Sequence, residues 1–231
     1  MKNLILLHGA LGEASQMEAL KTVLENKFKV YIPEFDGHGK KSNSTNSLDI
    51  DAMSDELNSF IENELLINPI VFGYSMGGYV ALNHALKYPH KIVKIITLAT
   101  KFEWNPESSA KESQLLNPDQ MELQIPAFCE ILKQRHGNDW KQLVIKTAEM
   151  MLQLGQNPVL TTLNLNRVTI PVLVCLGEKD KMVSLVESQN AVASLKQARL
   201  QILPDTPHPF ERVNMNQLAT IITQFLADSN E

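Results

Sequence analysis

Several features that mark other classes of protein are scarce in this 231-residue sequence. Its two cysteines, Cys129 and Cys175, are too few for a disulfide framework, and Cys175 lies in an apolar run, as a small core residue would. A reducing compartment, the cytoplasm, is therefore expected. No apolar run approaches the roughly 20 residues that a membrane span needs, and the run at 4–7 is too short for a signal peptide.

Positive charge is also scarce, with 21 Lys and Arg against 26 Asp and Glu and a formal net charge of −5. The chain thus lacks the basic footprint of a partner for nucleic acid or an anionic membrane. Repeats, low-complexity tracts and long blocks of like charge are absent. With 44% hydrophobic residues, the chain can bury a large core as one domain, with room for an inserted subdomain, whereas its composition leaves the oligomeric state open.

Short apolar runs alternate with amphipathic segments along most of the chain. Strands are predicted at residues 4–7, 28–32, 69–72, 92–99, 171–176 and 198–203. Helices are predicted at 13–26, 48–66, 78–86, 186–195 and 214–227. This alternation is typical of an α/β protein whose mostly or wholly parallel sheet of about six strands has helices on both faces.

The alternation breaks between residues 101 and 166, where no strand is evident. The pattern instead predicts helices at 108–116, at 119–136 with a break near Pro126, and at 139–154, closed by Gly155. We therefore expect a core formed by residues 1–100 and 167–231, with residues 101–166 inserted between the fourth and fifth strands as a helical cap.

The pentapeptide Gly-Tyr-Ser-Met-Gly at 73–77 joins the third predicted strand to a helix. A tight turn of this kind strains the backbone of its central residue, Ser75, and glycines at positions 73 and 77 leave room for it. The motif alone is weak evidence for a nucleophile. Its strand-turn-helix setting is the one that a nucleophilic serine requires.

Two further polar residues follow strands at the same predicted edge of the sheet. Asp180 comes just after the fifth strand and His208 just after the sixth, while Ser75 follows the third. Because the carboxyl ends of parallel strands meet at one edge, the three side chains are expected to lie close together. Serine, acid and histidine occur in that chain order.

With these motifs, the sequence resembles the α/β-hydrolase superfamily over nearly its whole length. The resemblance rests on residues 8–9, 36–42, 73–77 and 177–180 and on His208. It points to small, helical-capped members such as carboxylesterases, thioesterase-like enzymes and carbon–carbon bond hydrolases. The sequence departs from that pattern in two ways: its six strands include no equivalents of the family's two antiparallel opening strands, and Pro207 precedes the histidine where glycine is common.

The resemblance and the chemistry of these residue types together assign roles. Ser75 is the expected nucleophile, His208 its general base, and Asp180 the group that orients the imidazole. The backbone N–H of Met76, together with that of Ala10 or alternatively Leu11, is expected to hold the oxyanion. This chemistry requires no cofactor and no metal.

Other polar residues are rivals for these roles or have structural ones. Glu103, just after the fourth strand, is the alternative acid, and Asp205 is too close to His208 in sequence to be attractive. His8 is expected to hold the oxyanion loop in place. Structural roles are also expected for the turn residues Asp36 and His38 and for the helical histidines His84, His90 and His136, none of which has a partner for a metal site.

The insert is rich in flexible and aromatic apolar residues, which suit an apolar substrate. The expected pocket residues are Leu11, Tyr74, Phe102, Trp104, Met121, Phe128 and Met151. The function favoured is hydrolysis of a small apolar ester or thioester. A pathway-specific lyase or carbon–carbon bond hydrolase using the same triad, and a non-catalytic ligand-binding protein, remain the alternatives.

Overall fold

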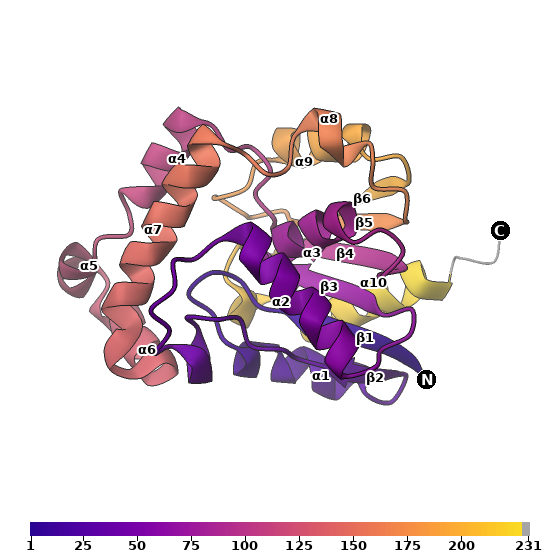
Figure 1. The fold of residues 1–231 in the computed structure, drawn as a ribbon, viewed down its shortest axis with the longest axis horizontal. Coiled ribbons are helices and arrows are strands. Elements are labelled where there is room, and N and C mark those ends of the chain that lie inside the picture. Colours follow the sequence, from indigo (N-terminus) through magenta and orange to yellow (C-terminus); the bar gives the residue numbers. More distant parts are fainter. Residues whose placement is uncertain (228–231) are drawn as a thin grey trace.

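A computed structural model of the protein describes residues 1–227 and is built on one six-stranded sheet (Figure 1). The strands are β1 (Lys2–Leu7), β2 (Phe28–Tyr31), β3 (Ile70–Tyr74), β4 (Lys94–Leu98), β5 (Val172–Gly177) and β6 (Ala198–Leu203). Their order is β2-β1-β3-β4-β5-β6, and every neighbouring pair is parallel. The predicted parallel α/β sheet of six strands is confirmed.

Both faces of the sheet are covered because the central strands are apolar on both sides. Ile5 and Leu7 of β1 belong to one hydrophobic cluster, with helices α2 (Ile50–Asn63), α3 (Met76–Lys87) and α9 (Leu185–Ser194). Leu4 and Leu6 belong to the other, with α1 (Glu18–Leu24) and α10 (Met215–Ala227). This division follows from the two-residue period of a strand.

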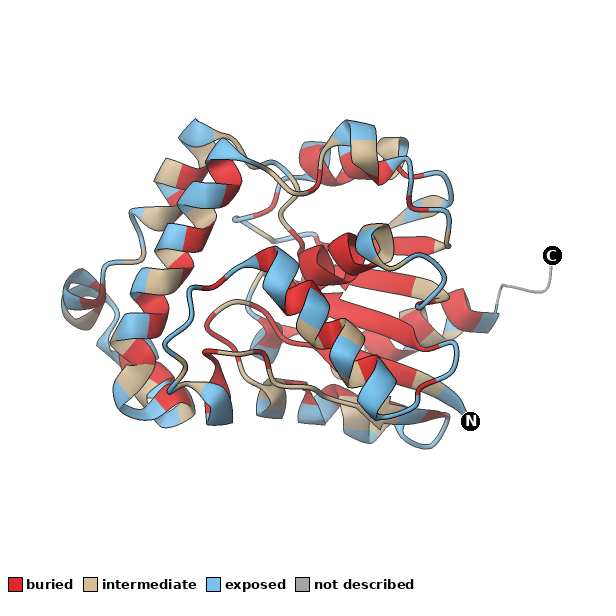
Figure 2. Cartoon of the chain, in the orientation of Figure 1, coloured by how far each residue is buried: buried red, intermediate tan, exposed pale blue. Residues whose placement is uncertain are grey.

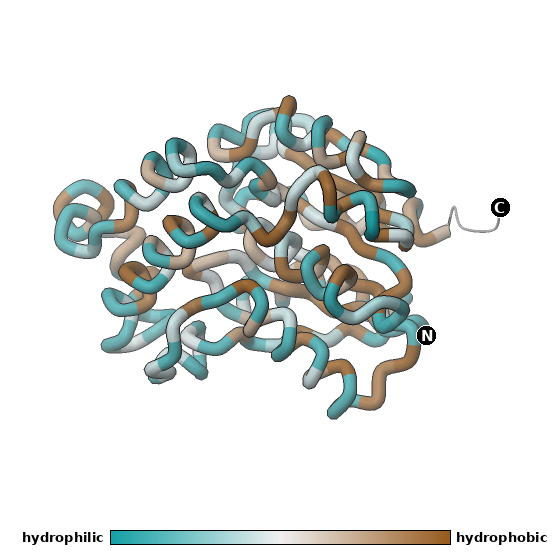
Figure 3. Tube along the Cα trace, turned by 45° about the horizontal axis from the view of Figure 1, so that its top comes forward, coloured by the Kyte–Doolittle hydropathy of each residue, from teal (hydrophilic) through white to brown (hydrophobic). Residues whose placement is uncertain are grey.

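Burial and hydropathy follow the same layers. The four central strands β1, β3, β4 and β5 are mostly buried, whereas the edge strands β2 and β6 are only partly buried and the surrounding helices are buried on one face (Figure 2). Hydrophobic residues gather along the central strands, and hydrophilic residues dominate the outer turns of the helices (Figure 3). Within residues 1–227, no helix is long and apolar enough to cross a membrane.

Five helices lie between β4 and β5, and we refer to this segment, residues 106–165, as the helical insert. They are α4 (Pro106–Ser113), α5 (Pro118–Gln124), α6 (Pro126–His136), α7 (Trp140–Gln156) and α8 (Thr162–Leu165). Four short 3-10 helices complete the described chain, namely η1 (Ala14–Met17), η2 (Gly39–Lys41), η3 (Gly137–Asp139) and η4 (Phe210–Arg212). The helices α4 to α7 lie at one end of the molecule (Figure 1).

The predicted break near Pro126 separates α5 from α6, but Gly155 does not end a helix. Helix α7 continues through Gly155 to Gln156. A Cβ at position 155 would overlap the side chain of Ser109 in α4. The glycine thus allows α4 and α7 to pack closely, a contact that periodicity along one helix cannot reveal.

The direction in which the chain moves across the sheet reverses at β1, which lies between β2 and β3. In open α/β sheets, ligands bind outside the carboxyl ends of strands at such a switch point. The loop after β1 and the turn after β3 both lie there.

Candidate active site

The turn from β3 to α3 places Ser75 in a strained conformation, with φ 50° and ψ −115°. The N–H of Ser75 donates to the Leu98 carbonyl at 2.8 Å, which fixes the turn to β4. A Cβ at Gly73 would overlap the backbone of Gly77 and Gly78, and one at Gly77 would lie 2.7 Å from the His8 carbonyl. The two glycines are therefore required by close backbone approach, as expected for a nucleophile elbow.

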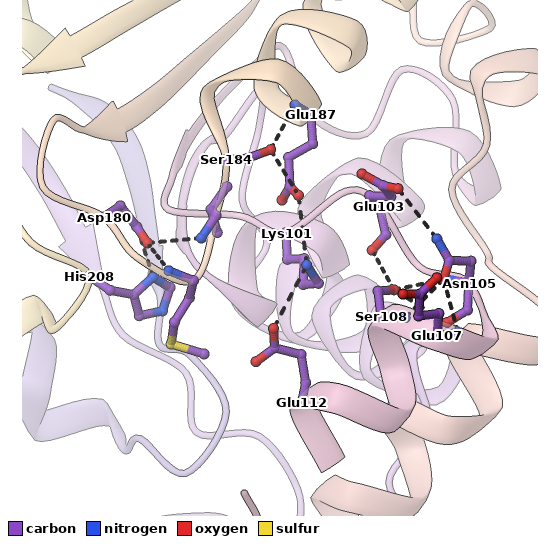
Figure 4. Close-up of polar contacts among 12 residues, drawn as sticks. Lys101, Glu103, Asn105, Glu107, Ser108, Glu112, Asp180, Ser184, Glu187 and His208 are labelled. Carbon is purple, nitrogen blue, oxygen red and sulfur yellow. Dashed lines mark hydrogen bonds and ion pairs between the residues drawn. The ribbon is translucent and has the colours of Figure 1, made fainter. Parts of the chain in front are cut away.

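Asp180 and His208 are joined by a hydrogen bond of 2.8 Å between Oδ2 and Nδ1 (Figure 4). The other carboxylate oxygen of Asp180 accepts from the N–H groups of Met182 and Val183 at 2.8 and 2.9 Å. The Asp180 side chain is 1% exposed, so its orientation is set by these three donors. With Nδ1–H donating to the carboxylate, Nε2 of neutral His208 is left as a proton acceptor.

Tyr74 links the elbow to the loop that carries His208. Its hydroxyl donates to the His208 carbonyl at 3.0 Å, and the two rings lie 5.7 Å apart. Burial raises the pKa of Tyr74 far above its ordinary value, so the hydroxyl remains a donor over the working pH range. Within residues 1–227, the Ser75 hydroxyl makes no hydrogen bond to the His208 ring; such bonds are often long in free enzymes.

The loop after β1 packs directly on the elbow. A Cβ at Gly9 would lie 2.9 Å from the Tyr74 ring and 3.2 Å from Ser75 Cβ, and Leu11 has a φ of 58°. Ala10 and Met76 both line the cavity at Ser75. Met76 is the first residue of α3, so its N–H has no partner within the helix. Leu11, the alternative donor, does not line this cavity.

The cavity at Ser75 has a volume of about 40 Å³ and is mainly apolar. Its walls are formed by Ala10, Ile50, Ser75, Met76, Tyr79, Lys101, Trp104, Met150, Met151 and Leu154. Trp104 and Met151 were among the predicted pocket residues, whereas Ile50, Tyr79, Lys101, Met150 and Leu154 were not. Lys101 could have been predicted from the sequence, because it follows β4 at the same sheet edge as Ser75. The others depend on how α2, α3 and α7 dock.

Five predicted pocket residues lie elsewhere. Leu11 is buried beside the cavity wall and Tyr74 lies against His208, while Phe102 lines a separate cavity of about 270 Å³. Met121 is buried inside the insert, and Phe128 is 36% exposed on its surface. An apolar residue on an amphipathic helix can face a pocket, the helix's own neighbours or a surface patch, and sequence spacing does not distinguish these.

His8 connects the loops after β1 and β2. It is fully buried, its Nδ1 lies 2.9 Å from the Gly9 carbonyl, and its Nε2 lies 3.1 Å from Glu34 Oε1. Burial alone would raise the pKa of Glu34, but His8 and the N–H of Ala14 hold that pKa below its ordinary value. The geometry places His8 between the two loops, not beside Ser75.

The two rival acids lie away from His208. Glu103 accepts a hydrogen bond from Asn105 at 3.3 Å, and Asp205 forms a surface ion pair with Lys179 at 2.7 Å. Neither contacts the imidazole, which is already bonded to Asp180.

Among the described residues, no group of three or more His, Cys, Asp or Glu side chains, the remaining histidines included, is arranged to hold a metal ion. His38 bonds the Asp36 carbonyl, and the Asp36 carboxylate accepts from Ser44 at 2.6 Å and Asn46 at 3.0 Å. His136 is buried between the insert and the loop after β1. Neither nitrogen of the buried His84 ring has a hydrogen-bond partner, whereas His90 is exposed.

Comparison with known proteins assigns this chain to a family. Residues 1–211 match the family Hydrolase_4, described as serine aminopeptidase, S33. The chain is 23% identical over 232 aligned residues to the pimeloyl-[acyl-carrier protein] methyl ester esterase of Nitrosomonas europaea, covering 90% of this chain and 89% of that protein. To the enzyme of the same name from Aromatoleum aromaticum it is 33% identical over 110 residues, which are 47% of this chain and 42% of the relative.

Among solved structures, a thermophilic esterase from Thermogutta terrifontis superposes with a TM-score of 0.79 at 22% identity, over 98% of this chain and 90% of that chain. At this identity the superposition shows the shared fold alone. Because the family match spans most of the sequence, this chain belongs to the Hydrolase_4 (serine aminopeptidase, S33) family of α/β hydrolases.

Proposed function

We propose that this protein is a serine hydrolase that cleaves a small ester or thioester through an acyl-enzyme intermediate. It is a hydrolase acting on ester bonds, as the names of its curated relatives indicate. The observation that carries the serine mechanism is the Asp180–His208 hydrogen bond at the sheet edge where Ser75 occupies a strained elbow.

In this mechanism, Nε2 of His208 takes the proton of the Ser75 hydroxyl as Oγ attacks the carbonyl carbon. Asp180 holds the imidazole in the required tautomer and stabilises the imidazolium. The N–H groups of Ala10 and Met76 stabilise the oxyanion, and one such donor contributes roughly 3–4 kcal/mol to lowering the barrier. His208 then protonates the leaving group and activates the water that releases the acyl group.

The helical insert acts in this proposal as a cap over the acyl group. Met150, Met151 and Leu154 of the insert, together with Trp104 just before it, contribute apolar walls to the cavity at Ser75. A cavity of about 40 Å³ has room for about three water-sized groups, which suits a short acyl chain. Two of the curated relatives are named pimeloyl-[acyl-carrier protein] methyl ester esterase; for this chain we propose hydrolysis of an ester, without the acyl-carrier protein as a partner.

Labelling with a fluorophosphonate probe tests the proposal. Mass spectrometry of the intact protein and its peptides should show one adduct, on Ser75, and none in Ser75→Ala. Turnover of p-nitrophenyl acetate should disappear in the same variant. A wild-type protein that neither labels at Ser75 nor turns over simple esters would instead support the ligand-binding alternative.

A further inference from the structure

Lys101 is the only ionisable side chain on the described wall of the cavity at Ser75, apart from the Tyr79 phenol. It is the third residue after the end of β4, and its side chain is 16% exposed. A cation in a small, mainly apolar cavity is costly unless it has partners. Its contacts therefore influence which acyl groups can bind in the cavity.

The Lys101 ammonium lies between two buried carboxylates, Glu112 of α4 and Glu187 of α9 (Figure 4). Nζ is 4.0 Å from Glu112 Oε1 and 3.7 Å from Glu187 Oε2, and it lies 5.7 Å from the Trp104 ring centre. These distances are too long for hydrogen bonds. Within residues 1–227 the ammonium donates no hydrogen bond, although it carries three N–H groups.

We propose that Lys101 donates a hydrogen bond to an uncharged oxygen, such as an ether, hydroxyl or carbonyl, on the substrate's acyl group. The inference rests on the proposed ester hydrolysis and specifies its substrate class. Lys101 lines the cavity that the acyl group enters, and within residues 1–227 its N–H groups have no acceptor at hydrogen-bond distance. An oxygen in the acyl chain supplies one.

The two glutamates explain why an uncharged acyl oxygen is preferred to a carboxylate. With both ionised, Lys101, Glu112 and Glu187 carry a formal charge of −1, which disfavours a carboxylate nearby. Burial raises the pKa of Glu187, and the adjacent Lys101 opposes this. Even with Glu187 protonated, the remaining Lys101–Glu112 pair is neutral and gives a substrate carboxylate no net attraction.

A structural role for Lys101 makes a different prediction. If its only role were to tie α4 to α9 through the two glutamates, its loss would affect every ester by the same factor. If it binds an acyl oxygen, its loss affects only esters that have one. Two p-nitrophenyl esters with acyl chains of equal length, methoxyacetate and butyrate, separate these cases, and the succinate monoester tests an anion.

The experiment measures kcat/KM of wild type and Lys101→Met for the three esters. The ratio of wild type to variant for one ester cancels the intrinsic reactivity of that ester. We expect the ratio for methoxyacetate to exceed that for butyrate by about 10- to 100-fold, the effect of one hydrogen bond to a charged donor. Because loss of Lys101 also makes the cluster more negative, the anion is compared in wild type alone, where kcat/KM for succinate should be lower than that for methoxyacetate.

Lys111→Met, on the exposed part of α4, is the matched control and should leave all three values unchanged. Equal ratios for methoxyacetate and butyrate would overturn the proposal in favour of the structural role, and a wild-type kcat/KM higher for succinate than for methoxyacetate would overturn the preference for an uncharged oxygen. If Lys101→Met does not fold, Lys101→Gln, which keeps an uncharged donor, should give a smaller difference in the same direction. A wild type with no Ser75 labelling and no turnover would refute the proposed function itself.

Discussion

His136 of the helical insert donates a hydrogen bond from Nε2 to the backbone carbonyl of Leu11, 3.1 Å away in the loop after β1. Its Nδ1 accepts from the N–H of Gly39 at 2.9 Å, which fixes the neutral tautomer with the proton on Nε2. The neighbouring Arg135 pairs with Glu211 at 2.6 Å, three residues beyond His208. The end of α6 thus holds two of the loops that surround Ser75.

Loss of the His136 contacts should therefore weaken both stability and catalysis. His136→Phe keeps a ring but leaves Gly39 N–H and Leu11 C=O without partners, at a cost of about 1–3 kcal/mol in the free energy of unfolding. Because Ala10 adjoins Leu11, kcat should fall about tenfold with little change in KM, a fraction of the effect of losing an oxyanion donor. Urea unfolding and ester kinetics measure the two effects, with the exposed His90→Phe as control; an unchanged kcat would show that the oxyanion loop keeps its position without His136.

Ser75 and His208 should act as a unit. Ser75→Ala and His208→Ala are each expected to lower kcat by about 10⁴-fold, and the double variant should be little worse than either single one, because both residues serve the same step. Circular dichroism should show folded proteins. Multiplied losses in the double variant would mean that the two residues contribute to different steps.

The acid is tested by a pair of conservative changes. Asp180→Asn should reduce kcat by about 10³- to 10⁴-fold with little change in KM, because an amide can stabilise the wrong imidazole tautomer. Glu103→Gln should be nearly silent, since Glu103 bonds Asn105 and not His208. The opposite pattern in kcat would move the acid to the loop after β4.

Acyl chain length should show an optimum set by the cavity. Each methylene that enters a dry pocket contributes up to about 0.8 kcal/mol to transition-state binding, so kcat/KM should rise from acetate towards butyrate. Beyond the roughly three groups that about 40 Å³ can hold, it should fall. A series of p-nitrophenyl esters measures this, and a steady decline from acetate would contradict an apolar acyl pocket.

His84 should make the protein less stable in acid. The ring is fully buried without hydrogen-bond partners, and burial lowers its pKa from 6.5 to about 4. Between these values the unfolded chain binds a proton that the folded protein does not, so stability falls as pH drops from 6.5 towards 4, by up to about 3 kcal/mol.

Urea unfolding of His84→Leu at several pH values isolates this contribution. The variant should lose less stability than wild type between pH 6.5 and 4, whatever its absolute stability, and His90→Leu should follow the wild-type curve. Parallel curves for His84→Leu and wild type would show that His84 is protonated equally in both states.

Much of this protein could be predicted from the sequence because the relevant signals are local. Apolar runs such as residues 4–7 encode strands buried on both faces, and their alternation with amphipathic helices encodes a parallel sheet. The elbow at Ser75 is also local, since the glycines that relieve its strain lie two residues away on each side. Asp180 and His208 could be predicted at the same sheet edge as Ser75 because they follow β5 and β6 and parallel strands end at one edge.

The pocket and its electrostatics were decided by the tertiary structure. Phe128 and Met151 look alike in sequence, but the docking of α6 and α7 leaves the first at the surface and the second at the cavity. The contacts of Lys101 with Glu187 and of His136 with Leu11 join segments far apart in the chain. The sequence pattern shows that a residue is apolar or charged. Which residue it contacts depends on how the helices pack, and this packing is determined only when the chain folds.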